Sequence, residues 1–173
     1  RAPDCERIAP LAAHGDDWPV FRGDLAGMAT SEAAIREDSR PVWQKSLQDG
    51  VTPTAPVAAG GLVFVAGSNG IVHAFDGATG DERWAAFSGG AVRYPPCIAE
   101  GRAFVGSGDG WVYAIEAATG RRLWRFRAAP AERRIPVYGS LQSTWPAASG
   151  VVVHDGVAYV AAGIVNYDGT HLY

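Results

Sequence analysis

Residues 74–84 read Ala-Phe-Asp-Gly-Ala-Thr-Gly-Asp-Glu-Arg-Trp, and residues 114–124 read Ala-Ile-Glu-Ala-Ala-Thr-Gly-Arg-Arg-Leu-Trp. Both stretches follow the pattern A-x-[DE]-x-A-T-G-x-x-x-W. The match extends upstream, where Gly61 corresponds to Gly101. A period of roughly 40 residues with several short strands per unit is typical of one blade of a β-propeller. The repeat therefore predicts an all-β fold made of four-stranded antiparallel blades.

The strand signals within one unit support this prediction. The sequence predicts strands at 56–59, 62–66, 71–76 and 82–87. Asn69-Gly70 lies between two of these apolar stretches, and Asn-Gly in that setting is a strong hairpin signal. Residues 62–65, Leu-Val-Phe-Val, are continuously apolar, as in a strand that is buried on both faces. Such a strand suits a blade that lies between two neighbouring blades.

The repeat spacing divides the chain into five parts. Trp43 precedes Trp84 by about one repeat and takes the same place in its unit. The parts are a tail or linker at 1–15, a partial first blade at 16–50, a complete blade at 51–90, a complete blade with a long connector at 91–149 and a truncated blade at 150–173. Because propellers typically have four to eight blades, these three to four blades cannot close a ring, and we expect an incomplete arc. We therefore expect these blades to pack against further blades of the same protein that follow Tyr173.

Composition narrows the function classes. The formal net charge of −3 predicts no attraction to nucleic acid, and no apolar run reaches the roughly 18 residues of a membrane span. The two cysteines, Cys5 and Cys97, match no zinc or C-x-x-C spacing. Two free or buried thiols are the favoured interpretation, and a disulfide between them stays open.

The repeat resembles that of the pyrroloquinoline-quinone (PQQ)-type propellers, which include quinoprotein alcohol dehydrogenases and a bacterial outer-membrane assembly lipoprotein. In that family the tryptophan docks against the neighbouring blade, with the alanine packed in the same junction. The resemblance thus implies a structural role for Trp43, Ala74, Asp76, Thr79, Gly80, Trp84, Ala114, Glu116, Thr119, Gly120 and Trp124. Glu116 replaces the usual aspartate, which we expect to alter a turn hydrogen bond and little else. The resemblance also implies eight blades in the complete ring and an exported protein of the periplasm or cell envelope.

The resemblance leaves more than one function open. Quinone-dependent dehydrogenases of this type stack the cofactor between a tryptophan and a disulfide of adjacent cysteines, and they bind calcium through Glu, Asn and Asp. This sequence has no adjacent cysteines and no acidic cluster with calcium-loop spacing. We therefore expect no catalytic residue, metal site or cofactor in this chain, and a non-catalytic scaffold that binds a protein or glycan. Part of a PQQ- and calcium-dependent dehydrogenase is the alternative, and regulation of an enzymatic domain before Arg1 is a third hypothesis.

Two departures from the repeat mark a candidate site. The interval from Gly101 to Gly156 is longer than one repeat, and the interval from Gly156 to Gly169 is longer than its counterpart, Gly101 to Gly110. The extra residues fall in 128–149 and around 164–168. Because strands alternate direction within a blade, we expect both insertions on one face and in contact. The candidate residues for a ligand or partner are Arg133, Arg134, Tyr138, Gln142, Trp145, Asn166, Tyr167 and Asp168.

Two plainer interpretations compete with this site. The insertions can be longer loops at the edge of the propeller that bind no ligand, or that contact another domain, with Tyr138 and Trp145 packing locally. Six arginines lie between Arg121 and Arg134. They suggest an anionic ligand or an acidic partner, but arginines on an outer strand are also commonly just solvated.

Overall fold

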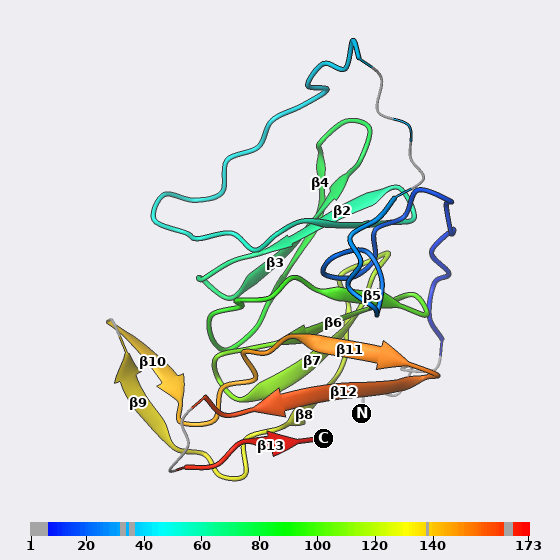
Figure 1. Cartoon of the computed structure of the whole chain (residues 1–173). Helices are drawn as coiled ribbons and strands as arrows, with labels where there is room; N and C mark the ends of the chain where they lie inside the picture. The colour runs from blue at the N-terminus through cyan, green and yellow to red at the C-terminus, as the bar shows by residue number, and fades with distance from the viewer. Residues whose placement is uncertain (1–6, 32–33, 35–36, 138, 165–167) are drawn as a thin grey trace.

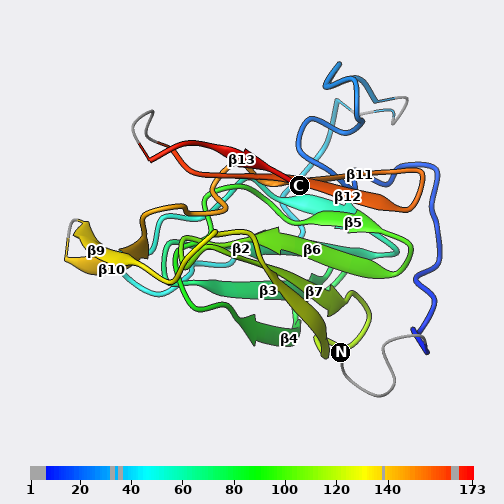
Figure 2. The ribbon, with the colours of Figure 1, turned by 90° about the horizontal axis from the view of Figure 1, so that it is seen from below.

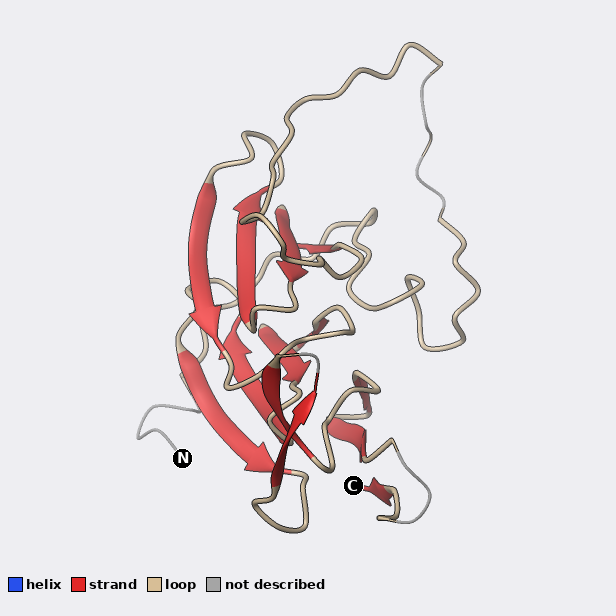
Figure 3. Cartoon of the chain, turned by 90° about the vertical axis from the view of Figure 1, so that its left-hand side faces the viewer, coloured by secondary structure: helices blue, strands red, loops and turns tan. Residues whose placement is uncertain are grey.

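The computed structural model describes residues 7–31, 34, 37–137, 139–164 and 168–173. These residues form thirteen β-strands and no helix (Figures 1 and 3). One antiparallel sheet contains β1 (Val57–Ala59), β2 (Leu62–Ala66), β3 (Ile71–Asp76) and β4 (Glu82–Phe87) in chain order. A second contains β5 (Cys97–Ala99), β6 (Arg102–Gly106), β7 (Trp111–Glu116) and β8 (Arg122–Arg127). The chain is all-β, as predicted.

Two further sheets follow in the second half of the chain. A two-stranded hairpin consists of β9 (Arg134–Val137) and β10 (Ser140–Ser143). A three-stranded sheet contains β11 (Val151–His154), β12 (Val157–Ala162) and β13 (His171–Leu172). Among the described residues of 16–50, Trp18 forms an isolated bridge with Ala58, and no strand is present.

The two four-stranded sheets share the same register, including one irregularity. Ala74 pairs with Trp84 and Ala114 pairs with Trp124, and in each sheet the register shifts at the next residue of the inner strand. Such a β-bulge leaves one residue of the outer strand without an opposite partner and turns the strand. The shared bulge sets the direction in which both tryptophans leave their sheets.

Two hydrophobic cores lie between successive sheets. The first includes Phe64, Val72 and Trp84 from the first sheet with Val105 and Ile115 from the second. The second core joins the second sheet to β11 and β12, and the half-buried Trp124 packs against it. Continuously apolar strands are needed because each inner strand is covered on both faces.

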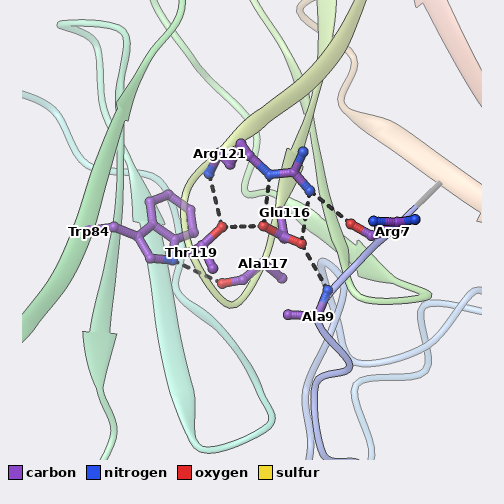
Figure 4. A network of polar contacts seen from close by, with 7 residues as sticks. All are labelled: Arg7, Ala9, Trp84, Glu116, Ala117, Thr119 and Arg121. Carbon is purple, nitrogen blue, oxygen red and sulfur yellow. Dashed lines mark hydrogen bonds and ion pairs between the residues drawn. The ribbon is translucent and has the colours of Figure 1, made fainter. Parts of the chain in front are cut away.

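Each of the first two repeat tryptophans contacts the turn of the following unit. The Trp84 indole N–H donates to the carbonyl of Ala117 at 2.9 Å (Figure 4), and that of Trp43 donates to Gly77 at 2.8 Å. The rings also lie against the Thr-Gly turns, since a Cβ on Gly120 would be 2.7 Å from the Trp84 ring. Gly120 has φ +76, a left-handed conformation that glycine adopts without strain.

Residues 7–17 run past the β1–β2 turn at Gly60 and the β5–β6 turn at Gly101, and we call this segment the N-terminal strap. Ile8 and Leu11 pack against the two hydrophobic cores. The Ala9 N–H donates to Glu116 Oε1 at 2.8 Å, and Arg121 Nη2 donates to the carbonyl of Arg7 at 2.9 Å (Figure 4). Of the segment expected as a tail or linker, residues 7–15 thus lie against the folded sheets, while residues 1–6 lie outside the described residues.

The side chain of Glu116 does more than alter one turn hydrogen bond, so that expectation was too narrow. Asp76, at the same place in the preceding unit, accepts the backbone N–H groups of Ala78 and Thr79. The longer Glu116 side chain instead accepts from the Thr119 hydroxyl, the Arg121 guanidinium and the strap. The extra methylene thus converts a local turn cap into an anchor between distant parts of the chain.

Glu116 gives the fold a specific acid sensitivity. Arg121, followed by the Thr119 hydroxyl and the Ala9 N–H, lowers the pKa of Glu116 from 4.5 to about 2, against the opposing effect of burial. A carboxyl whose pKa is depressed by folding stabilises the protein above its unfolded pKa, and this contribution is lost as the pH falls through the folded pKa. We therefore expect urea-unfolding stability to fall between about pH 5 and pH 2.

The variant Glu116→Gln tests this expectation. Glutamine does not titrate, so the urea-unfolding stability of this variant should depend less on pH over that interval than the stability of the wild type. Glu132→Gln serves as a control, because Glu132 is exposed and its ion pair with Arg134 is long, at 3.5 Å. An equal pH dependence in wild type and Glu116→Gln would contradict the anchoring role.

Cys97 is a buried free thiol, and burial raises its pKa. Cys5 lies outside the described residues. None of the described residues belongs to a helix with the length and hydropathy of a membrane span.

Candidate binding site at the two insertions

The first insertion contains the β9–β10 hairpin. The hairpin pairs Arg134 with Ser143 and Val137 with Ser140, and it projects from the body of the sheets (Figures 1 and 2). Gly139 at its tip has φ +81, the left-handed conformation that tight hairpin turns require. The sequence pattern did not predict this hairpin, although Gly139 marks its turn.

The second insertion falls between β12 and β13, and its residues 165–167 lie outside the described residues. Its described candidate residue is Asp168. Three candidates, namely Tyr138, Asn166 and Tyr167, lie outside the described residues.

The two insertions contact each other through three side chains. The Arg133 guanidinium forms an ion pair with the Asp168 carboxylate. The same guanidinium lies 4.8 Å from the centre of the Trp145 ring, within the range of a cation–π interaction. The Trp145 indole N–H donates to the carbonyl of Asp168 at 2.7 Å. We call Arg133, Trp145 and Asp168 the insertion clamp, and it fixes one insertion against the other.

The base of the hairpin is held on the second four-stranded sheet. Gln142 is buried, and its Oε1 accepts a long hydrogen bond from Arg93 at 3.5 Å. The Ser143 N–H donates to the carbonyl of Gly108 at 2.8 Å. Arg134, by contrast, does not join the clamp, since it forms its ion pair with the exposed Glu132. The structure thus brings four of the eight candidates, Arg133, Gln142, Trp145 and Asp168, to the base of the insertions.

A groove of about 320 Å³ lies between β10 and the loops of the first four-stranded sheet. Its walls carry hydroxyl, amide and backbone groups and no charged side chain. The lining residues are Ser68, Asn69, Ser88, Gly89, Gly90, Ala91, Ser140, Leu141 and Gln142. Sequence reasoning missed every one of these residues except Gln142. The sequence marks Ser68-Asn-Gly70 only as a hairpin turn, because the repeat gives no sign that an insertion much later in the chain leans toward it.

The floor beside this groove is held by a buried hydrogen-bond pair. The Tyr113 hydroxyl donates to Asp109 Oδ2 at 2.5 Å and accepts the Gly89 N–H at 3.1 Å. Burial, followed by the adjacent Asp109 carboxylate, raises the pKa of Tyr113 to about 12. The phenol therefore stays neutral and keeps the Gly89 backbone in place. The groove offers donors and acceptors for an uncharged polar ligand, with the exposed Leu141 as an apolar contact.

Within the described residues, no group of three or more His, Cys, Asp or Glu side chains is arranged to hold a metal ion. The insertion clamp and the groove present charge pairing, hydrogen bonding and apolar contact. This chemistry suits recognition of a ligand or partner.

A family model described as outer membrane protein assembly factor BamB matches residues 31–168, which is more than half of the chain. The chain belongs to this family. The sequence-based resemblance to PQQ-type propeller repeat proteins is therefore confirmed. No curated protein matches the chain.

Solved structures confirm the propeller fold of this BamB-family chain. It superposes with a TM-score of 0.71 on the quinohemoprotein alcohol dehydrogenase ADHIIG of Pseudomonas putida HK5, at 18% identity over 87% of this chain and 23% of that one. The quinohemoprotein alcohol dehydrogenase of Comamonas testosteroni gives 0.66 at 20% identity, over 94% and 26%. A europium-containing methanol dehydrogenase gives 0.66 at 18% identity, over 88% and 28%. The chain thus spans about a quarter of each of these structures and forms part of a propeller.

Proposed function

We propose that this chain is a non-catalytic propeller scaffold whose two clamped insertions bind a protein or glycan partner. The observation that carries the proposal is the insertion clamp, in which Arg133, Trp145 and Asp168 tie together the two places where the repeat is interrupted. A site that is already ordered before its partner arrives binds at a lower entropic cost.

The family description supports an assembly role, since it names an outer membrane protein assembly factor. The same description favours a location in the cell envelope, which we propose for this protein as well. The groove between β10 and the first sheet suits such a partner, because its uncharged polar wall and Leu141 can contact a polypeptide or a sugar.

Site-directed photocrosslinking tests the proposal in the cell. The photoreactive residue p-benzoylphenylalanine is placed at Leu141, which is 63% exposed on the hairpin. The matched control carries it at Val42, which is 79% exposed. Its neighbour Trp43 contacts Gly77 in the β3–β4 turn, at the end of the first sheet opposite the groove. We expect one dominant crosslinked adduct from Leu141 and none of the same mass from Val42. Protease digestion and periodate staining of the adduct then distinguish a protein from a glycan. Equal crosslinking from both positions would contradict a site at the insertions.

The alternative function, part of a PQQ- and calcium-dependent dehydrogenase, rests on the superposition with alcohol and methanol dehydrogenases. Its test is separate. The purified protein is incubated with PQQ and calcium, and reduction of an artificial electron acceptor is followed with a primary alcohol as substrate. We expect no alcohol-dependent reduction above that of PQQ alone. Saturable turnover would favour the dehydrogenase and overturn the scaffold.

A further inference from the structure

Strand β8 carries an arginine row that has no counterpart in the preceding repeat. Arg122, Arg125 and Arg127 are all exposed. The residues at the same places in β4 are Glu82, Ala85 and Phe87. The two strands occupy equivalent edge positions in two sheets of equal register, so the fold itself does not require arginine there.

The β-bulge places the three arginines on one face. In a regular strand Arg122 would point away from Arg125 and Arg127, because side chains alternate between faces. The observed pairs are Arg122 with Ile115, Arg125 with Tyr113 and Arg127 with Trp111. Directly paired residues share a face, and these partners are alternate residues of β7. The bulge therefore aligns three guanidinium groups along one side of the strand.

The arginine row is available for binding. Among the ion pairs of the described residues, none includes Arg122, Arg125 or Arg127. The Arg125 guanidinium lies 4.3 Å from the centre of the Trp111 ring, which restricts its conformations. A guanidinium that is held in place forms paired hydrogen bonds with a carboxylate at a smaller entropic cost.

The backbone of β8 is also available on one side. β8 is the last strand of its sheet, with β7 as its pairing partner. An edge strand presents unpaired N–H and C=O groups that an added strand can pair with. Alternate residues on one face of an added strand are about 7 Å apart, the same spacing as Arg125 and Arg127.

We propose that β8 is a docking strand for an extended acidic segment of a partner protein. The segment pairs its backbone with the free edge of β8, and its alternate carboxylates contact the arginine row. This surface is distinct from the insertion clamp, so the inference does not depend on the function proposed above.

The test uses a fluorescently labelled peptide of alternating Asp and Thr. Its fluorescence anisotropy is measured as the full-length protein that contains this chain is added. We expect saturable binding that weakens with salt, since the carboxylate–guanidinium contacts are solvent-exposed. The triple variant Arg122→Gln, Arg125→Gln, Arg127→Gln should raise the Kd about tenfold, as three exposed ion pairs would. The control triple Arg22→Gln, Arg40→Gln, Arg83→Gln changes the net charge equally at exposed positions and should leave the Kd near its wild-type value.

Three results would overturn the proposal. The first is an equal loss in both triple variants, which would mean attraction to overall charge. The second is equal binding of a peptide with the same composition but all Asp residues in one block, which would exclude contact of alternate carboxylates with the arginine row. Equal binding of the alternating peptide with every amide N-methylated would likewise exclude strand pairing. The third is arginine-dependent binding to phosphatidylglycerol vesicles but not to the peptide, which would assign the row to a membrane surface.

Discussion

Replacement of Trp84 by alanine is expected to lower the free energy of unfolding by about 3–5 kcal/mol, the range for a large aromatic residue removed from a core. Trp84 is 8% exposed, packs in the first hydrophobic core and donates to Ala117 of the next unit. Its loss creates a cavity and also frees the Ala117 carbonyl. Urea unfolding followed by circular dichroism measures the change.

Two variants of the same strand make this result specific. Trp84→Phe keeps most of the buried ring but loses the indole N–H, so it should cost clearly less than alanine. Phe87→Ala removes an exposed ring and should change stability by less than about 0.5 kcal/mol. If Trp84→Ala cost no more than Phe87→Ala, the junction would not depend on this tryptophan.

Gly120 lies on the other side of the contact with Trp84. Its replacement by alanine should lower the free energy of unfolding by about 3 kcal/mol, because two unfavourable effects add there. Gly120 has φ +76, and an added Cβ would lie 2.7 Å from the Trp84 ring. The left-handed conformation costs an alanine roughly 1–2 kcal/mol, and overpacking adds about 1–3 kcal/mol. Urea unfolding again measures the loss.

Gly61 provides the matched control for this substitution. It has a similar φ of +75, but an added Cβ meets nothing within 4 Å. Gly61→Ala should therefore cost only the conformational part, about 1–2 kcal/mol. Equal losses of stability for the two glycines would show that contact between the turn and the tryptophan contributes nothing.

The repeat made much of the fold predictable. Strands β2, β3 and β4 begin and end at the residues that the sequence predicted, because alternating turns and apolar stretches mark both ends of each strand. The packing of one blade against the next cannot be predicted from single residues. It is predicted by the recurrence of Ala-Thr-Gly and tryptophan at a fixed spacing.

Two features were not predictable from the pattern. The β9–β10 hairpin contains Pro136, which cannot donate a backbone hydrogen bond and lowers the strand signal, but an isolated hairpin tolerates it at an edge. The N-terminal strap has no strand or helix periodicity, and its contact with Glu116 joins residues 107 positions apart. Such tertiary contacts leave no local mark in the sequence.

The contact between the two insertions was predictable, but the side chains that make it were not. Counting residues between glycines located both insertions, and strand direction predicted that they meet. The ion pair of Arg133 with Asp168 and the polar wall of the groove depend on side-chain placement in three dimensions. A spacing argument identifies the loops that lie together, whereas only the three-dimensional structure identifies the pairs.

The most direct test of the proposed binding site is the photocrosslinking yield at position 141 when the insertion clamp is broken by Arg133→Ala. The substitution removes both the ion pair with Asp168 and the stacking on Trp145. The Arg134→Ala variant is the control, because Arg134 lies beside it and contacts Glu132 instead. We predict that the adduct falls to the background of position 42 in Arg133→Ala and persists in Arg134→Ala. An undiminished adduct in Arg133→Ala, with the fold intact by circular dichroism, would contradict the claim that the clamped insertions form the binding site.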